Sequence, residues 1–297
     1  MSKAFFHLPG LFEFYDFYKV FFPLYFSRHE YFYDFCEISS VYGSPADCIW
    51  GGGRAGFGNA DAKDVFDLMN EFKISARLTF SNSLLQKEHL SDKKCNDLCK
   101  LFEKSTVQSG IIISSDLLLN YIKEKFPCFY FVSSTTKVLV HFDDFKNELC
   151  REDFKFAVSD FRLNTQFEKL KSLSQSQKDK TEFLCNECCD FDCKERKSCY
   201  ENVSRLNLGE NVPLYKCASK NCESGYKFSN AMKNPGFIGI SDIQKKYLPM
   251  GFSNFKIEGR SLGSAVLLEF LLHYLTKPEH QLEVREALYL DSELDLF

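Results

Sequence analysis

The chain has 297 residues and a formal net charge of −4, and 13 of its residues are cysteine. An odd number of cysteines excludes a fully paired disulfide framework within one chain, and a chain of this length can bury an apolar core without disulfides. The slightly acidic charge argues against a broadly basic surface for nucleic acids. No apolar run approaches the length of a membrane-spanning helix, and the first residues lack the pattern of a secretory signal. We therefore expect a cytoplasmic protein. In such a reducing compartment, clustered cysteines usually bind metals or carry out redox chemistry.

Short apolar runs rich in β-branched and aromatic residues alternate along the chain with segments of helical periodicity. The expected strands cover Leu11–Phe14, Ile74–Phe80, Gly110–Ser114, Cys128–Val132, Phe154–Ser159, Glu182–Leu184, Gly236–Ile240 and Asn254–Ile257. The expected helices cover Asp61–Phe72, Lys94–Glu103, Asp116–Lys125, Gln166–Leu173, Ser241–Tyr247 and Ser261–Leu275. Ser115 and Ser241 are suited to start helices, because a short polar side chain accepts hydrogen bonds from free amides. We expect residues 172–180 to form a polar loop.

Repeated strand–helix units favour a parallel sheet covered by helices. About eight strands in a chain of this length fit a closed barrel better than a doubly wound sheet, so we predict a TIM-like α/β barrel over residues 1–297 as a single domain. Functional residues in such a barrel lie at the carboxyl ends of the strands. Several expected strands end in polar residues, which include Asp160, Glu187, Glu258 and Arg260.

The cysteines are unevenly distributed. The region between Cys185 and Cys222 contains Cys185, Cys188, Cys189, Cys193, Cys199, Cys217 and Cys222, and the remaining cysteines are expected to be mostly buried thiols. Residues 185–225 lack clean periodicity, so we predict a cysteine-rich, metal-binding insertion within the barrel. Thiolates are natural ligands of zinc and of iron–sulfur clusters. The cysteine spacing matches neither a radical-enzyme triplet nor a two-cluster ferredoxin nor a zinc ribbon. The spacing alone therefore does not decide between an iron–sulfur cluster, a zinc site and no metal.

The stretch Gly51–Gly56 formally matches the G-x-G-x-x-G pattern of dinucleotide-binding folds. That fold needs a strand directly before the loop and a helix at its end, and neither is clear here. We interpret the stretch as a flexible loop between a strand and a helix on the catalytic face. In that loop, Arg54 would hold an anionic group.

The stretch Asn254–Arg260, N-F-K-I-E-G-R, resembles the K-I-E-G-R signature of the collagenase-like peptidases, family U32, and it follows a cysteine-rich segment as in that family. Weaker similarity at 42–54 and 157–164 extends the resemblance over roughly residues 35–275. The resemblance implies a TIM-like barrel with a four-iron, four-sulfur (4Fe–4S) cluster held by four cysteines. Relatives include enzymes of oxygen-independent hydroxylation that act on RNA or on ubiquinone precursors, and some relatives are described as proteases. The chain departs from the family in its compressed cysteine spacing and in reading K-I-E-G-R-S-L-G.

By position, the resemblance implies Cys189 and Cys193 as cluster ligands. The predicted set is completed by Cys185 and Cys217, and its alternatives are Cys48, Cys188, Cys199 and Cys222; zinc is the alternative metal. The candidate catalytic residues at the barrel mouth, which would bind or protonate the substrate, are Glu258, Arg260, Arg54 and Asp160.

We therefore expect an iron–sulfur enzyme, an oxygen-independent hydroxylase or related oxidoreductase, whose substrate is an RNA, a peptide or a small molecule. Three alternatives are kept. The first is a peptidase, the second a non-catalytic, cluster-bearing partner of another subunit, and the third a zinc-stabilised protein that binds or modifies RNA.

Overall fold

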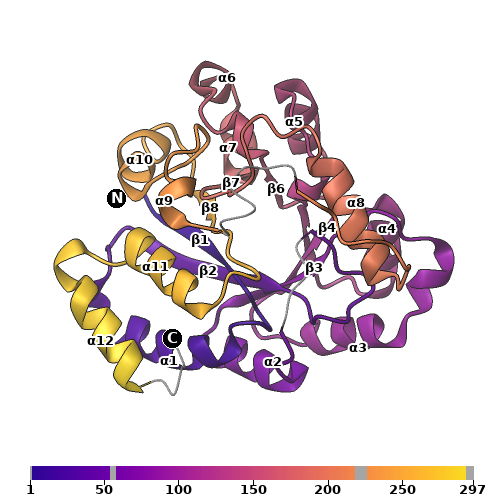
Figure 1. Ribbon diagram of the computed structural model, residues 1–297, viewed down its shortest axis with the longest axis horizontal. Helices are drawn as coiled ribbons and strands as arrows, with labels where there is room; N and C mark the ends of the chain where they lie inside the picture. The colour runs from indigo at the N-terminus through magenta and orange to yellow at the C-terminus, as the bar shows by residue number, and fades with distance from the viewer. Residues whose placement is uncertain (1, 54–57, 218–225, 292–297) are drawn as a thin grey trace.

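The structure, a computed structural model, describes residues 2–53, 58–217 and 226–291 (Figure 1). The described residues form eight strands that close into a parallel barrel, in which neighbours follow chain order and β8 pairs with both β7 and β1. The strands are β1 (Ala4–Pro9), β2 (Cys36–Gly43), β3 (Ser75–Phe80), β4 (Gly110–Ile113), β5 (Tyr130–Ser133), β6 (Phe156–Val158), β7 (Thr181–Leu184) and β8 (Asn254–Lys256). The predicted TIM-like α/β barrel is confirmed.

Helices surround the barrel (Figure 1). They are α1 (Tyr15–Ser27), α2 (Ala62–Glu71), α3 (Lys93–Phe102), α4 (Asp116–Lys125), α5 (Phe142–Leu149), α6 (Phe167–Lys171), α7 (Gln175–Lys180), α8 (Arg196–Asn207), α9 (Phe228–Ala231), α10 (Ile240–Asp242), α11 (Ser264–Tyr274) and α12 (Gln281–Asp291). A π-helical turn, Ile243–Tyr247, continues α10. Within the described ranges, no helix has both the length and the apolar character needed to cross a membrane.

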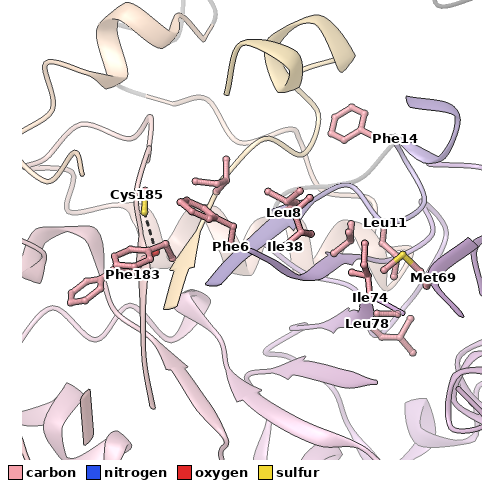
Figure 2. Packing of buried hydrophobic residues seen from close by; sticks show 14 of the residues in the cluster. Phe6, Leu8, Leu11, Phe14, Ile38, Met69, Ile74, Leu78, Phe183 and Cys185 are labelled. Atoms are coloured by element: carbon pink, nitrogen blue, oxygen red, sulfur yellow. Dashed lines mark hydrogen bonds between the residues drawn. The ribbon is translucent and has the colours of Figure 1, made fainter. Parts of the chain in front are cut away.

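Two apolar regions result from the alternation of side chains along the strands. The larger region lies between the strands and the helices, where Phe6, Leu8, Ile38 and Leu78 are buried (Figure 2). The smaller region lies inside the barrel and comprises Tyr42, Ile112, Val132, Val158 and Leu184. The barrel interior also contains buried polar and charged side chains, and these position the candidate site.

Two of the expected strands are wrong, and two real strands were missed. Leu11–Phe14 lies in the turn that follows β1, directly after Gly10, whose φ is 83°. Gly236–Ile240 is buried beside β7, where the Ile238 amide donates to the Cys185 carbonyl, but it does not join the barrel. Strands β1 and β2 were not predicted. Apolar content alone therefore did not separate a barrel strand from a buried connection.

The expected helices match observed helices, with shifts at their ends. Ser115 caps α4 as predicted, because its hydroxyl accepts from the Leu118 amide at 3.4 Å. Ser241 does not start a helix, since α10 begins directly after Gly239. The expected polar loop at 172–180 is wrong in part, because Ser174 forms a capping box with Gln177 and starts α7.

Candidate functional site

A buried cluster of charged side chains occupies the interior of the barrel. Arg77 on β3 donates to Glu182 on β7 at 2.6 Å, and the Lys256 ammonium of β8 lies 3.4 Å from the same carboxylate. The Nε2 atom of His7, on β1, lies 3.5 Å from Glu182. Burial raises the pKa of Glu182, but Arg77, His7 and Lys256 together outweigh this effect and lower that pKa to about 2. Glu182 is therefore the common counter-charge of the cluster.

The two weaker bases of this cluster have lowered pKa values. Burial, reinforced by the charge of Arg77, lowers the pKa of His7 to about 3. Burial likewise lowers the pKa of Lys256 to about 7, even though Glu182 acts in the opposite direction. The Lys256 ammonium lies 3.3 Å from the centre of the Tyr42 ring. Lys256 thus connects the charged cluster below to the pocket above, which it helps to line.

A pocket opens at the carboxyl ends of the strands. Its lining residues are Tyr42, Gly53, Thr79, Ser81, Ile112, Ser134, Thr135, Thr136, Val158, Leu184, Glu187, Tyr200, Lys256, Glu258 and Arg260. The hydroxyl oxygens of Thr79 and Ser81 are buried and have no hydrogen-bond partner among the residues that the structure describes. Because buried polar groups are normally satisfied, two unsatisfied hydroxyls beside a pocket are suited to a polar ligand.

Glu187 and Glu258 bring two buried carboxylates to this pocket. Asn186, at the end of β7, accepts from the Glu258 amide at 2.7 Å and donates to the Glu258 carbonyl at 3.0 Å. Glu187 accepts from the amides of Cys188 at 2.9 Å and Cys189 at 3.0 Å, and it forms an ion pair with Arg196 of α8. Hydrogen bonds to the backbone therefore hold Glu187 and Glu258 in place just beyond the ends of β7 and β8.

Arg260 and the glycine-rich loop meet across the mouth of the barrel. Arg260 donates to the Gly52 carbonyl at 3.4 Å. Gly53 has a φ of 78°, and a Cβ atom there would lie 2.9 Å from the Arg260 guanidinium. Cys48–Trp50 is not a strand, so the dinucleotide-binding interpretation gains no support. Arg54, a predicted catalytic residue, lies outside the described residues.

Asp160 follows β6 but does not line the pocket. Its carboxylate accepts from the Arg162 side chain at 2.7 and 3.0 Å. Arg162 in turn donates to the Cys193 carbonyl at 3.0 Å. The structure therefore connects this predicted catalytic residue to the cysteine-rich segment, which it anchors through Arg162.

The predicted cluster cysteines differ in their surroundings. Cys185 is fully buried beside Phe183 in the apolar core (Figure 2), and burial raises the pKa of its thiol well above the usual range. Cys189 and Cys193 are half-buried, and Cys217 is exposed. An apolar, protonated thiol is a poor metal ligand, so the surroundings of Cys185 argue against its membership in the set.

The alternative ligands also fall into different places. Cys188 and Cys199 are half-buried, and Cys222 lies outside the described residues. Cys48 is buried with its sulfur 3.4 Å from that of Cys95. Across the described ranges, side chains of metal-ligating type whose ligand atoms all lie within 4.8 Å of one another form one group, Glu187, Cys188 and Glu258. The cysteine ligand set itself stays a prediction.

Of the predicted catalytic residues, Glu258 and Arg260 line the pocket, together with Lys256, Glu187 and Tyr200, which were not predicted. Lys256 stands inside the K-I-E-G-R stretch, and Glu187 was noted only as a polar strand end. Tyr200 carried no sequence signal, because it reaches the pocket from α8 through the fold of the insertion.

No protein-family model matches the chain, and no curated protein is similar to it in sequence. Among solved structures, the chain is similar to "The Structure of the U32 Peptidase Mk0906", with a TM-score of 0.54. The two share 11% sequence identity over 87% of this chain and 93% of that chain. At this identity the likeness establishes a common barrel fold, which agrees with the fold implied by the K-I-E-G-R resemblance.

Proposed function

We propose that the chain is an enzyme whose active site is the pocket at the carboxyl ends of the barrel strands. The observation that carries this proposal is the burial, around one pocket, of two carboxylates, a lysine and two unsatisfied hydroxyls. Burying charged and unsatisfied polar groups destabilises a fold, and such groups gather where a protein binds or converts a ligand. An enzyme of TIM-barrel fold has its active site at this same face.

Within this proposal, Glu258 is the acid–base group. It is buried, it lines the pocket, and Asn186 fixes its backbone on both sides. Arg260 supplies a positive charge for an anionic part of the substrate. Lys256 and Tyr42 form the polar floor beneath it.

The finer proposal is an iron–sulfur-dependent oxidoreductase, of the oxygen-independent hydroxylase kind. Cys189, Cys193 and Cys217 fit a thiolate centre better than Cys185 does, because they are partly or fully exposed. Arg196 lies near Cys189 and brings a positive charge to this segment. The fourth ligand is Cys199 or Cys222. Such a cluster, when bound, supplies electron transfer or an open iron for substrate.

We expect the protein purified without oxygen to be brown, with about four iron and four sulfide per chain. Replacing Cys189 and Cys193 together by alanine should remove the colour, while replacing buried Cys36 by alanine should leave it. The measurements are the visible absorption spectrum and metal and sulfide analysis. A colourless protein with stoichiometric zinc would contradict the iron–sulfur proposal and favour a zinc centre.

We expect Glu258→Gln to lower the rate of the reaction by about 10²–10⁴-fold, because it removes a positioned proton donor or acceptor without removing volume. The exposed Glu279→Gln is the matched control. Mass spectrometry measures both possible outcomes after peptides and RNA are incubated without oxygen, in water, with the oxidised protein and an added two-electron acceptor. A mass gain of one oxygen supports hydroxylation. Cleaved peptides instead support the peptidase alternative, which the similarity of this barrel to that of a U32 peptidase suggests.

A further inference from the structure

We infer that Glu187, Cys188 and Glu258 form a binding site for a single divalent transition-metal ion at the edge of the pocket, separate from the cysteine cluster. Their ligand atoms all lie within 4.8 Å of one another, so one ion can contact all three. Two carboxylates and a thiolate suit zinc and similar first-row metals. Three protein ligands with an open fourth position are typical of catalytic rather than structural zinc sites.

The backbone around these ligands is already fixed. The side chain of Asn186 binds the amide and the carbonyl of Glu258, which joins the ends of β7 and β8. Glu187 is held by backbone amides on one oxygen and by Arg196 on the other. Metal-ligating carboxylates usually carry such outer hydrogen bonds, because they orient the ligand and limit its motion.

Two further observations point to a ligand here. The buried hydroxyls of Thr79 and Ser81 line the same pocket as Glu187 and Glu258, and within the described part of the chain neither has a hydrogen-bond partner. The phenol of Tyr226 has a raised pKa, caused first by burial and then by the negative charges of Glu258, Cys188 and Glu187. Glu187, Cys188 and Glu258 therefore lie close together at the edge of a pocket that also contains unsatisfied hydroxyls.

Three positive side chains lie near this group. Arg260 lines the same pocket and donates to the Gly52 carbonyl. Arg196 is paired with Glu187, and Lys256 is paired with Glu182 below the pocket. Two carboxylates and an ionised thiol carry one negative charge more than a divalent ion supplies. The guanidinium of Arg196, which is paired with Glu187, offsets that remaining charge.

In the pocket, a metal at this position would polarise an oxygen of the substrate or hold a water molecule. The inference goes beyond the proposed function and does not depend on it, because it uses none of the cysteines assigned to the cluster. It stands if the cysteine cluster proves to hold zinc or no metal.

Cobalt(II) is the probe, because a cobalt–thiolate bond gives an ultraviolet charge-transfer band in addition to visible bands. The full chain with its cysteine cluster as purified is titrated with cobalt(II) and zinc without oxygen. We expect one equivalent of added cobalt with a thiolate band, and displacement of that cobalt by zinc. Cys188→Ser should remove the thiolate band. Loss of an outer hydrogen-bond partner lowers metal affinity by about 10–100-fold. Glu258→Gln removes a ligand and should weaken cobalt binding by more than that.

The neighbouring Cys189→Ser is the matched control. It should lower the iron or zinc content of the cysteine cluster and leave the added cobalt equivalent in place. Cys188→Ser should do the reverse, so failure of the cluster proposal and failure of this inference give different results. Circular dichroism checks that each variant is folded, and Glu258→Gln decides the question if Cys188→Ser does not fold. A thiolate band that persists in Cys188→Ser, or cobalt affinity unchanged in Glu258→Gln, would overturn the site.

Discussion

Replacing Glu182 by glutamine lowers the free energy of unfolding by about 3–5 kcal/mol, the usual cost of removing one partner from a buried ion pair. Glu182 and Arg77 are both fully buried inside the barrel. Without the carboxylate, Arg77 keeps the Tyr130 hydroxyl, 2.9 Å from its Nε, as a hydrogen-bond acceptor, but loses its counter-charge. The barrel interior offers no water-like medium to solvate the remaining charge.

Urea unfolding followed by circular dichroism measures this loss. The control is Glu168→Gln, which breaks the exposed pair with Lys171 and should change stability by no more than about 1 kcal/mol. Arg77→Met is itself destabilising, but the double variant should lose less than the sum of the two single losses, because it leaves no unpaired guanidinium. Strict additivity, or a loss from Glu182→Gln as small as that of the control, would show that the cluster does not act as a unit.

The barrel was predictable because its signal is repeated. Six of its strands alternate with helical segments, and each repeat adds to the same conclusion. Strand β1 escaped prediction, because its inward residue His7 pairs with Ser40 and Asn254, which are distant in sequence. The sequence pattern of one strand contains no information on such partners.

Residues of the candidate site could be predicted only where a charged residue follows the end of an expected strand. Glu258 and Arg260 met that condition and line the pocket. Arg77 did not stand out, because a charged residue within a strand ordinarily faces solvent, whereas here it faces the barrel interior. The cysteines show the same limit. Cys185 and Cys188 look equivalent in the sequence, but the first faces the apolar core and the second lies beside the pocket glutamates.

Stability falls as the protein is acidified from pH 6.5 to 4.5, and protonation of His7 in the unfolded chain contributes to this fall. Its pKa is about 3 in the folded barrel and 6.5 as an ordinary histidine. Between these values the unfolded chain binds a proton that the folded chain does not bind, so the free energy of unfolding decreases as pH falls. Glu182 acts in the same direction, but only below its ordinary value of 4.5, because its folded pKa is about 2. Burial also lowers the pKa of His273, so comparison with a His7 variant, rather than the pH range alone, isolates the contribution of His7.

Over those two pH units, His7 accounts for a loss of about 2–3 kcal/mol. His7→Gln keeps a polar side chain next to Ser40 and Asn254 and cannot take up a proton. The variant is less stable at neutral pH, yet its free energy of unfolding should depend less on pH between 6.5 and 4.5 by about this amount. Urea unfolding at a series of pH values measures the difference, and His141→Gln at an exposed position is the control. Parallel curves for His7→Gln and the unaltered protein would mean that His7 takes up a proton as readily in the folded barrel as in the unfolded chain, with Glu182 next to it as the counter-charge.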